Sequence, residues 1–331
     1  MDFLSFAFGI IVGINDFLYR LGIFKKHKVN CFVVSVGNLS VGGTGKTPAI
    51  EWLVSWSLKN NLKPGVVARG YGANFKGVKK VHLNTDIFFG DEPEVIAQKF
   101  PSVPVYVCSK KYLAAQEISR IENLDILFID DGFQHKSLHR DLDLLLVDSL
   151  STEKEWALMP KGRLRESIGA AQRADVLLVS RANLVDQNVW PKNLRDVAAE
   201  FSKRKKPVVK INFEISGFTS GSEGSKVDEI KNEVVLLSGI GRPRSFELLI
   251  ATKKKYLKHY AFADHFNYKT ADVAQILMDH PNCSIVTTQK DFVKIKKLDL
   301  DLKRIFVAEL GTTWLGDASA VEEILLKGVQ K

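Results

Sequence analysis

A glycine-rich stretch near residue 40 contains the residue types that bind phosphate groups. Three glycines, Gly42, Gly43 and Gly45, allow successive backbone N–H groups to converge on one anion at the start of a helix. Lys46 would then reach the outer phosphates of a polyphosphate, and the Thr47 hydroxyl would bind Mg²⁺. The spacing predicts a nucleotide-binding loop made of Ser40, Val41, Gly42, Gly43, Thr44, Gly45, Lys46 and Thr47.

The match to the P-loop pattern G-x-x-x-x-G-K-[ST] is incomplete, because Ser40 stands where the first glycine is expected. The surrounding sequence supports the motif. Residues 32–36 are an apolar run of the kind that is buried in parallel sheets, and apolar residues recur on one helical face after the loop. Pro48 fits a first helical turn, where its missing N–H has no intrahelical partner. A glycine-rich turn without a ligand is the alternative.

Two pairs of adjacent carboxylates follow at other strand or loop ends. Asp130 and Asp131 close an apolar run, as a Walker-B carboxylate does when it binds Mg²⁺ directly or through water. Asp91 and Glu92 precede a helical stretch, where one carboxylate could accept a substrate hydroxyl proton while the other assists the metal. Both pairs also have a structural interpretation, as a turn cap and as a helix cap.

Histidines are weaker candidates. His265 follows a predicted strand in the C-terminal part of the chain, and a lone histidine of this kind is as compatible with a structural hydrogen bond as with catalysis. His135 and His139 are four residues apart, a spacing that could bind zinc on a helix. The glycine before them and the strand expected from Leu142 favour a turn instead.

Four arginines lie in loops that contain Gly or Pro. Bidentate donors in flexible turns suit phosphate recognition, although each of them could equally be a solvated surface charge. They are Arg69, Arg163, Arg165 and Arg242.

Predicted strands and helices alternate from residue 30 onward. This alternation predicts an α/β fold with a P-loop NTPase-like parallel sheet and helices on both faces, in which ligands bind beyond the carboxyl ends of the strands. We expect strands at 32–36, 65–69, 103–108, 125–130, 142–147, 176–180, 208–211, 234–237, 256–262, 284–288 and 305–307. Helices are expected after the glycine loop and at 94–100, 246–254, 271–280 and 320–327.

A Gly- and Ser-rich stretch at 217–225 is the clearest change of composition. The chain is long enough for two cores. We therefore expect a membrane-associated helix, a P-loop domain, a linker and a second, smaller α/β domain. A cleft between the two domains would close over substrate if the linker acts as a hinge. The expected ranges are 1–28, 29–216, 217–230 and 231–331.

Charge and cysteine content limit the partners. The 331 residues carry a formal net charge of +9, which favours nucleic acid, an anionic membrane surface or a phosphorylated substrate. No basic run is interleaved with aromatic residues, so nucleic acid is the least supported of the three. Cys31, Cys108 and Cys283 are far apart, which fits a reducing compartment without disulfides or a zinc site.

The N-terminal segment Phe3–Ile14 is apolar all round. It lacks the basic n-region and cleavage site of a secretory signal, and it is too short to span a bilayer easily. Basic residues follow at Arg20, Lys25, Lys26 and Lys28, which favours an anionic cytoplasmic leaflet. We expect a helix that dips into, or barely crosses, the inner face of a membrane. A helix packed on the protein's own core is the alternative.

Together these motifs resemble those of the tetraacyldisaccharide 4'-kinases of lipid A biosynthesis, over nearly the whole chain. The most specific are Val36-Gly-Asn-Leu-Ser-Val-Gly-Gly-Thr-Gly-Lys-Thr-Pro48 and Asp130-Asp-Gly-Phe-Gln-His135, and Ser40 itself fits, because these kinases commonly carry Ser or Thr there. Others are Leu18–Gly22, Arg69–Gly72, Gly90–Pro93, Pro160–Glu166, Gly239–Gly241, Asp264-His265 and Thr287–Asp291. The resemblance implies an enzyme at the cytoplasmic face of the inner membrane. It would use ATP and Mg²⁺ to phosphorylate the 4'-hydroxyl of a tetraacylated glucosamine disaccharide 1-phosphate, giving the lipid IVA-type product.

The resemblance also implies roles for individual residues. Asp91 would be the general base, oriented by His265, and because the two lie on different predicted domains the pair would form only in a closed cleft. The metal site would comprise Thr47, Glu92, Asp130 and Asp131. Substrate contacts are expected from Asn38, Arg69, Tyr71, Gln134, His135, Arg163 and Arg165. The implied partners are the acylated lipid and the membrane surface, with no nucleic acid and no obligatory protein partner.

Two other classes of function remain open at this point. A soluble P-loop kinase or ligase for a small metabolite would act without detergent or lipid and would ignore acyl chains. A nucleotide-dependent switch on the membrane would couple hydrolysis to partner binding. The switch has no visible base-specificity motif, and it leaves Asp91 and His265 unexplained.

Overall fold

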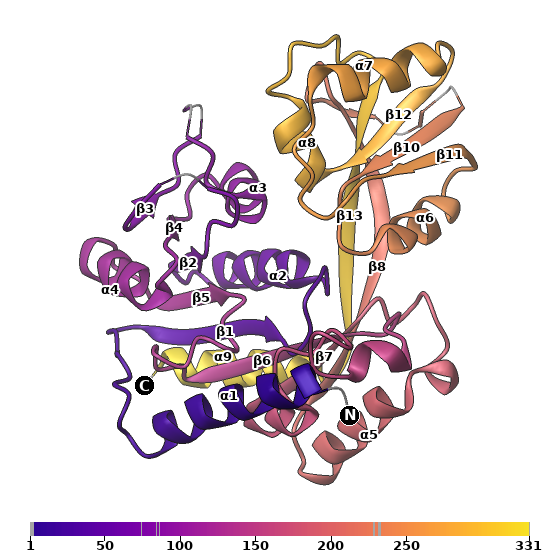
Figure 1. The fold of residues 1–331 in the computed structure, drawn as a ribbon. Coiled ribbons are helices and arrows are strands. Elements are labelled where there is room, and N and C mark those ends of the chain that lie inside the picture. The colour runs from indigo at the N-terminus through magenta and orange to yellow at the C-terminus, as the bar shows by residue number, and fades with distance from the viewer. Residues whose placement is uncertain are drawn as a thin grey trace. The chain divides into compact units, whose positions relative to one another are not determined.

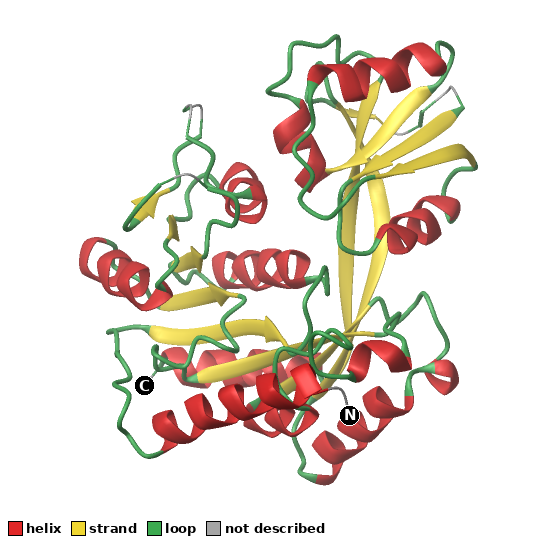
Figure 2. Cartoon of the chain, viewed as in Figure 1, coloured by secondary structure: helices red, strands yellow, loops and turns green. Residues whose placement is uncertain are grey.

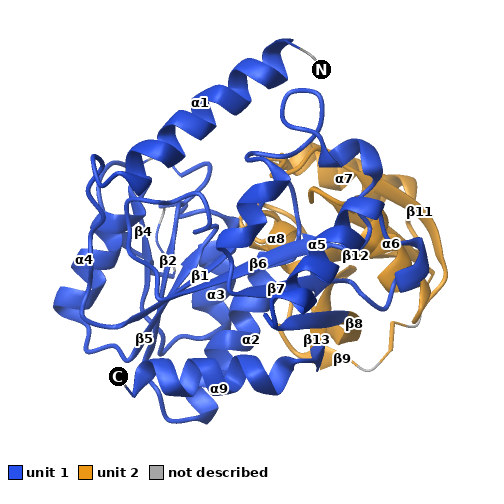
Figure 3. Ribbon diagram, turned by 90° about the horizontal axis from the view of Figure 1, so that it is seen from below, with its two compact units in different colours: residues 1–212, 313–331 blue, residues 213–312 orange. Residues whose placement is uncertain are grey.

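The chain divides into two compact units (Figure 3). The computed structural model describes residues 3–73, 75–83, 85, 87–227, 229–230 and 233–330. The first unit comprises residues 1–212 and 313–331, and the second comprises residues 213–312. The second unit is therefore inserted into the sequence of the first.

A mostly parallel sheet forms the centre of the first unit (Figure 1), and its strands follow the order β8-β7-β6-β1-β5-β2-β4-β3. The strand β1 pairs in parallel with β5 on one side and with β6 on the other, whereas β3 at the edge is antiparallel to β4. The inner strands are buried along their whole length, as expected when both faces of a parallel sheet are covered. The strands are β1 Phe32–Asn38, β2 Pro64–Ala68, β3 Lys79–Lys80, β4 Val105–Val107, β5 Ile126–Asp130, β6 Leu142–Asp148, β7 Val176–Ser180 and β8 Val208–Ser220.

Helices lie on both sides of these strands (Figure 2). One buried cluster joins Ile118 of α4 to Val33 and Leu127, and another joins Leu194 of α5 to Leu145. The helices of this unit are α1 Phe3–Arg20, α2 Lys46–Lys59, α3 Asp91–Lys99, α4 Lys111–Ile121, α5 Lys192–Lys203 and α9 Ala318–Val329, with 3-10 turns η1 Glu153–Trp156, η2 Ile168–Arg173 and η3 Gln187–Val189. The predicted fold class is confirmed.

The second unit has its own core and its own parallel strands. Val235 and Leu237 of β10 pack with Ile285 of β12 and with Val273 and Ile276 of α7. Its strands follow the order β11-β10-β12-β13, and the part of β8 from Phe213 onward comes next to β13 in this order. Its elements are β9 Lys226–Val227, β10 Val234–Ser238, β11 Tyr256–Ala261, β12 Ser284–Thr288, β13 Ile305–Gly316, α6 Pro243–Ala251, α7 Thr270–Asp279 and α8 Gln289–Ile295.

The compact units differ from the domain ranges expected from the sequence. The Gly- and Ser-rich stretch was expected to be a linker at 217–230, but its first residues complete β8. Phe213 and Ile215 are buried in alternation with their neighbours, and after two residues that are not buried the burial resumes at Phe218. The strand β13 likewise runs on to Gly316, well past its predicted end at 307. The chain after residue 312 belongs to the first unit and not to the second.

The helix α1 is peripheral and exposed. In Figure 3 it lies at the edge of the first unit, apart from the sheet. Ser5 is its one buried residue among those that the structure describes, and the Ser5 hydroxyl donates to the Leu158 carbonyl (3.1 Å). Asp16 forms an ion pair with Lys136 (3.1 Å). Within the described residues, α1 is the one helix long and apolar enough to cross a membrane, a criterion that core helices and signal sequences also meet.

Candidate functional site

Polar residues end four neighbouring parallel strands of the first unit. Asn38 ends β1, Asp130 ends β5, Asp148 ends β6 and Ser180 ends β7. The registers place Val36 beside Asp130 and Asp148 beside Ser180. Because the carboxyl ends of parallel strands meet at one edge, these side chains gather where α/β folds bind ligands.

The glycine loop connects β1 to α2 as predicted. The helix α2 begins at Lys46, directly after Gly45, whose φ of 93° is accessible to glycine at little cost. Gly37, one residue before the end of β1, has a different role. A Cβ at this position would lie 2.7 Å from the Phe133 backbone nitrogen, so only glycine lets β1 approach the Asp130–His135 turn.

Residues 163–165 pair with the beginning of the glycine loop. The Val41 N–H donates to the Arg163 carbonyl (2.9 Å), the Arg165 N–H donates to the Leu39 carbonyl (2.7 Å), and Ser40 forms a β-bridge with Leu164. Bridged backbone of this kind needs no glycine, which explains why serine is tolerated at the first position of the motif.

Asn38 is fully buried and holds the loop together. Its side-chain amide nitrogen donates to the Thr44 hydroxyl (2.8 Å), and its amide oxygen accepts from the Lys46 ammonium group (3.4 Å). Its backbone carbonyl accepts from Gln134 Nε2 (2.9 Å) and from Arg165 Nη2 (3.1 Å). In this structure Asn38, Gln134 and Arg165 therefore bind one another around the loop, and their predicted substrate contacts stay predictions.

The two adjacent aspartates occupy different electrostatic environments. Asp131 forms two 2.7 Å bonds with the Arg165 guanidinium group and lies 3.5 Å from Lys46 Nζ. Although burial opposes its ionisation, Lys46 and Arg165 hold the pKa of Asp131 below its ordinary value. Burial raises the pKa of Asp130 to about 6; Lys46 opposes this shift, and the negative charge of Glu92 adds to it.

Asp130 fits a magnesium ligand better than Asp131 does. Its Oδ1 atom is buried without a hydrogen-bond partner in the described structure, whereas both carboxylate oxygens of Asp131 face cations. The described residues contain no cluster of three or more His, Cys, Asp or Glu side chains that could bind a metal alone. Mg²⁺ in nucleotide enzymes needs only one or two protein oxygens, because substrate phosphates and water complete its coordination.

Lys111 is a site residue that sequence patterns did not indicate. It begins α4 and is almost completely buried, and its ammonium group donates to the Asp131 carbonyl (2.6 Å). Burial lowers the pKa of Lys111 to about 8, against the opposing effect of the Asp131 and Asp130 charges. Because no motif surrounds it, only the packing of α4 against the end of β5 could have identified it.

Asp91 and Glu92 form the start of α3, and Asp91 is buried. Gly90 precedes them with a φ of 109°, and a Cβ there would lie 3.2 Å from the backbone of Gly70 and Tyr71. This close approach places the carboxylate pair beside the predicted Arg69–Gly72 turn. Arg69 and Tyr71 are exposed, as substrate-binding residues would have to be.

Two of the predicted substrate-binding residues differ in character. The Arg163 side chain is about 41% exposed, lies 3.6 Å from Glu155, and reaches over Gly42 of the loop. His135 is half-buried, and its Nε2 accepts from the Tyr112 N–H (3.1 Å). Burial, together with the charge of Lys111, lowers the pKa of His135 to about 4, so the ring is neutral. The His135 ring therefore makes a structural hydrogen bond with Tyr112. The His139 ring has a different partner, Asp141, at 3.3 Å.

In the second unit the predicted His265 lies in a tight turn after β11. Its φ is 59°, and its N–H donates to the Gly239 carbonyl (3.0 Å). The Gly239 N–H in turn donates to Asp291 Oδ1 (2.9 Å), which also accepts from the Tyr268 hydroxyl (2.9 Å). Three sequence motifs of the second unit therefore converge on one turn: Gly239–Gly241, Asp264-His265 and Thr287–Asp291.

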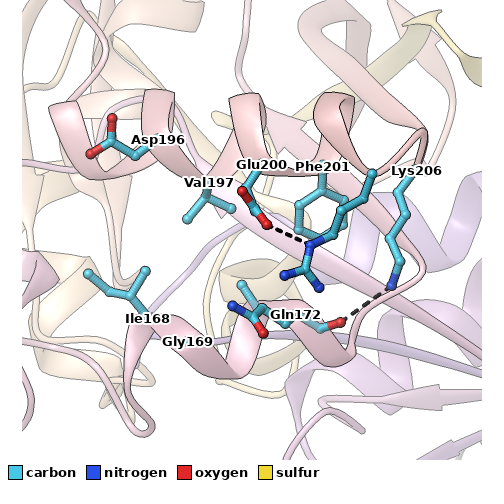
Figure 4. A pocket seen from close by; sticks show the side chains of 10 residues that line it. Ile168, Gly169, Gln172, Asp196, Val197, Glu200, Phe201 and Lys206 are labelled. Carbon is cyan, nitrogen blue, oxygen red and sulfur yellow. Dashed lines mark hydrogen bonds and ion pairs between the residues drawn. The ribbon is translucent and has the colours of Figure 1, made fainter.

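A shallow pocket in the first unit lies between η2 and α5 (Figure 4). Its lining includes Ile168, Val197, Phe201, Arg204 and Lys206. None of the predicted site residues lines it, so it is separate from the strand ends described above.

Comparison with known proteins gives a consistent result. The family model of tetraacyldisaccharide-1-P 4'-kinase matches residues 1–330. The tetraacyldisaccharide 4'-kinase of Bdellovibrio bacteriovorus is 34% identical over 97% of this chain and 96% of its own, and that of Chlorobium phaeobacteroides is 30% identical over 88% and 85%. The crystal structure of LpxK from Aquifex aeolicus in complex with ATP superposes with a TM-score of 0.76 at 25% identity, covering 98% of this chain and 97% of that one. This chain belongs to the tetraacyldisaccharide 4'-kinase family of lipid A biosynthesis.

Proposed function

We propose that this kinase transfers the γ-phosphate of ATP to the 4'-hydroxyl of a tetraacylated glucosamine disaccharide 1-phosphate. Family membership supports the activity, and the arrangement of the glycine loop supports the chemistry. The observation that carries the proposal is that Lys46, Asp130 and Asp131 meet at the carboxyl ends of β1 and β5. This is the arrangement that phosphoryl transfer from a nucleotide requires.

The loop would hold the nucleotide. Backbone N–H groups at the start of α2 and the Lys46 ammonium group would bind the phosphates. The Lys46 ammonium group also contacts Asp131 and Asn38. Thr47 and Asp130 would bind Mg²⁺, with Glu92 nearby. When bound, the cation would neutralise charge on the phosphates. Asp131, paired with Arg165, would position Lys46.

Asp91 would act on the acceptor. As the 4'-oxygen attacks the γ-phosphorus and ADP leaves, the hydroxyl proton would pass to the Asp91 carboxylate. His265 of the second unit would orient this carboxylate. Arg69, Tyr71 and Arg163 are the exposed candidates for contacts with the sugar or with its 1-phosphate.

The helix α1 would place the enzyme on the cytoplasmic face of the inner membrane, where the acyl chains of the substrate remain. Its exposed residues include Phe3, Phe6, Ile10, Ile14 and Phe17, which recur at helical spacing along one face. This exposure supports a membrane surface rather than the protein's own core as the partner of the helix.

Incubation with radiolabelled ATP would test the proposal directly. Acylated disaccharide 1-phosphates in detergent micelles should accept label, whereas unacylated sugars should not. Label on none of the lipids would refute the proposed function. Label on unacylated sugars at equal rates would support a kinase for small metabolites instead.

We predict that His265→Ala lowers kcat far more than it raises KM for ATP, because the imidazole acts on the transfer step and not on nucleotide binding. Steady-state kinetics with saturating lipid would measure both constants. His139→Ala is a suitable control, because His139 lies near Asp141 at the surface of the first unit. An unchanged kcat for His265→Ala would remove this histidine from the mechanism.

A further inference from the structure

The end of β7 contacts the glycine loop through residues that have no part in the proposed reaction. The buried Ser180 hydroxyl donates to the Thr44 carbonyl (2.7 Å). Arg181, the next residue, donates from Nη2 to the Gly43 carbonyl (2.9 Å). Two consecutive side chains of β7 and its turn thus bind two consecutive carbonyls of the loop.

Arg181 is itself held firmly. Its guanidinium group forms an ion pair with the buried Asp148 at the end of β6 (2.9 Å), and its own carbonyl accepts from the Ser149 hydroxyl (2.8 Å). Its φ is 56°, a left-handed conformation that costs free energy in any residue with a side chain. A buried, ion-paired arginine in this conformation persists only because several contacts fix it.

The orientation of the loop carbonyls determines that of the loop N–H groups. In a planar trans peptide the C=O and the following N–H point in opposite directions. Binding the Thr44 carbonyl to Ser180 therefore turns the Gly45 N–H, at the start of α2, away from β7. The Thr44 N–H already donates within the loop, to the Gly42 carbonyl (3.0 Å). The group that the Ser180–Thr44 hydrogen bond orients is therefore the Gly45 N–H.

We propose that Ser180 and Arg181, with Asp148, are positioning residues that fix two successive peptides of the glycine loop for binding ATP phosphates: Ser180 fixes Thr44–Gly45, and Arg181 fixes Gly43–Thr44. The inference rests on the proposed role of the loop in binding ATP. It adds a second support to the loop on the β7 side, independent of the residues 163–165 that pair with its beginning. These residues touch the loop and not the reacting atoms, so their effect is on nucleotide affinity.

Direct binding of ATP, measured by calorimetry with MgCl2 and without lipid, would test the inference. Ser180→Ala should weaken ATP binding about fivefold, the effect of one lost hydrogen bond. Arg181→Lys should weaken it further, because an ammonium group cannot contact Gly43 and Asp148 with the same fixed geometry. The KM for the lipid should stay unchanged in both variants.

Ser57→Ala is the matched control. The Ser57 hydroxyl is also fully buried and also donates to a backbone carbonyl, that of Leu53 (2.8 Å), but it lies in the last turns of α2. Thermal unfolding should show similar losses of stability for Ser57→Ala and Ser180→Ala, with ATP affinity lowered only in the latter. Equal ATP affinity in these two variants would overturn the inference. It would leave the proposed lipid kinase activity, which is measured separately by transfer of label, unaffected.

Discussion

Asp130 and Asp131 are adjacent in the chain but face opposite electrostatic environments. Asp131 lies among cations, and Asp130 lies in a buried position near Glu92. The pair therefore separates into one carboxylate whose charge stabilises the fold and one whose charge costs stability. Both are part of the proposed site, but only the second has a buried oxygen left for a further ligand.

Asp130→Asn should stabilise the unliganded protein at pH 8. A carboxyl group with a pKa of about 6 when folded binds more protons than the unfolded chain between about pH 4 and 6, so its ionisation lowers stability as pH rises through that range. Removing it should gain roughly 3 kcal/mol at pH 8 and almost nothing at pH 4. Urea unfolding at both pH values measures the difference.

Asp131→Asn should act in the opposite direction at pH 8, because it leaves the Arg165 guanidinium group without its carboxylate partner. The two substitutions are chemically identical and one residue apart, so each controls for the other. If both changed stability with the same sign, the assignment of opposite environments would be wrong. Transfer of label to the lipid should fall in both.

At the scale of elements, Gly37 shows how closely β1 approaches the Asp130–His135 turn. Gly37→Ala should destabilise the protein by about 1–3 kcal/mol, because the new methyl group would meet the backbone of Phe133 and neither strand nor turn can move freely. Gly13→Ala in α1 is the control: a Cβ there meets nothing within 4 Å, and alanine favours a helix. Chemical denaturation of both variants checks the prediction, and an equal effect would contradict it.

The exposed face of α1 makes a separate prediction. Replacing Phe6, Ile10 and Phe17 together by serine should release the enzyme from membrane vesicles, because it removes apolar area that the fold itself does not bury. Flotation with anionic vesicles measures binding. Val189→Ser and Met278→Ser, which alter exposed apolar residues elsewhere, should leave flotation unchanged. Unaltered binding of the α1 variant would exclude the helix as the anchor.

Much of this element arrangement could be predicted from the sequence, because buried parallel strands are continuous apolar runs. Ile126–Asp130 and Val176–Ser180 were found at their observed bounds or within a residue of them. The extension of β8 could not be predicted, because Gly and Ser weaken the sequence signal for a strand. Phe218 is nevertheless buried as part of this strand. Contacts between distant elements could not be predicted either. Lys111, Ser180 and Arg181 lie outside any recognisable motif, and their hydrogen bonds depend on the order of the strands in the sheet.

At the scale of the whole molecule, the C-terminal segment completes the first unit. Trp314 stacks on Trp52 of α2 with ring centroids 3.9 Å apart, and Asp317 accepts from the Val208 N–H (2.9 Å). Gly328 of α9 packs so closely on Phe32 that a Cβ would overlap its ring. This segment therefore supports both the nucleotide-loop strand and the helix that follows the loop.

Removing residues 313–331 should destabilise the first unit and abolish ATP binding, although the segment contains no predicted site residue. Differential scanning calorimetry should show loss or lowering of the transition that ATP stabilises in the full chain. As a control, Lys327→Ala changes only an exposed i,i+4 ion pair on α9 and should cost less than about 0.5 kcal/mol. Retention of full ATP affinity by the shortened chain would contradict the assignment of this segment to the first unit.

The insertion of residues 213–312 within the first unit also sets an order of events during synthesis. Domains fold as they leave the ribosome when all their parts are present. The inserted unit is continuous in sequence, so it has all its residues before α9 has been made. The first unit begins to emerge before the inserted unit, starting with α1. It can be completed only after residues 313–331 have been made. A chain halted before residue 313 should therefore hold an exposed apolar helix and an unfinished nucleotide site, so membrane contact should precede the capacity for phosphoryl transfer.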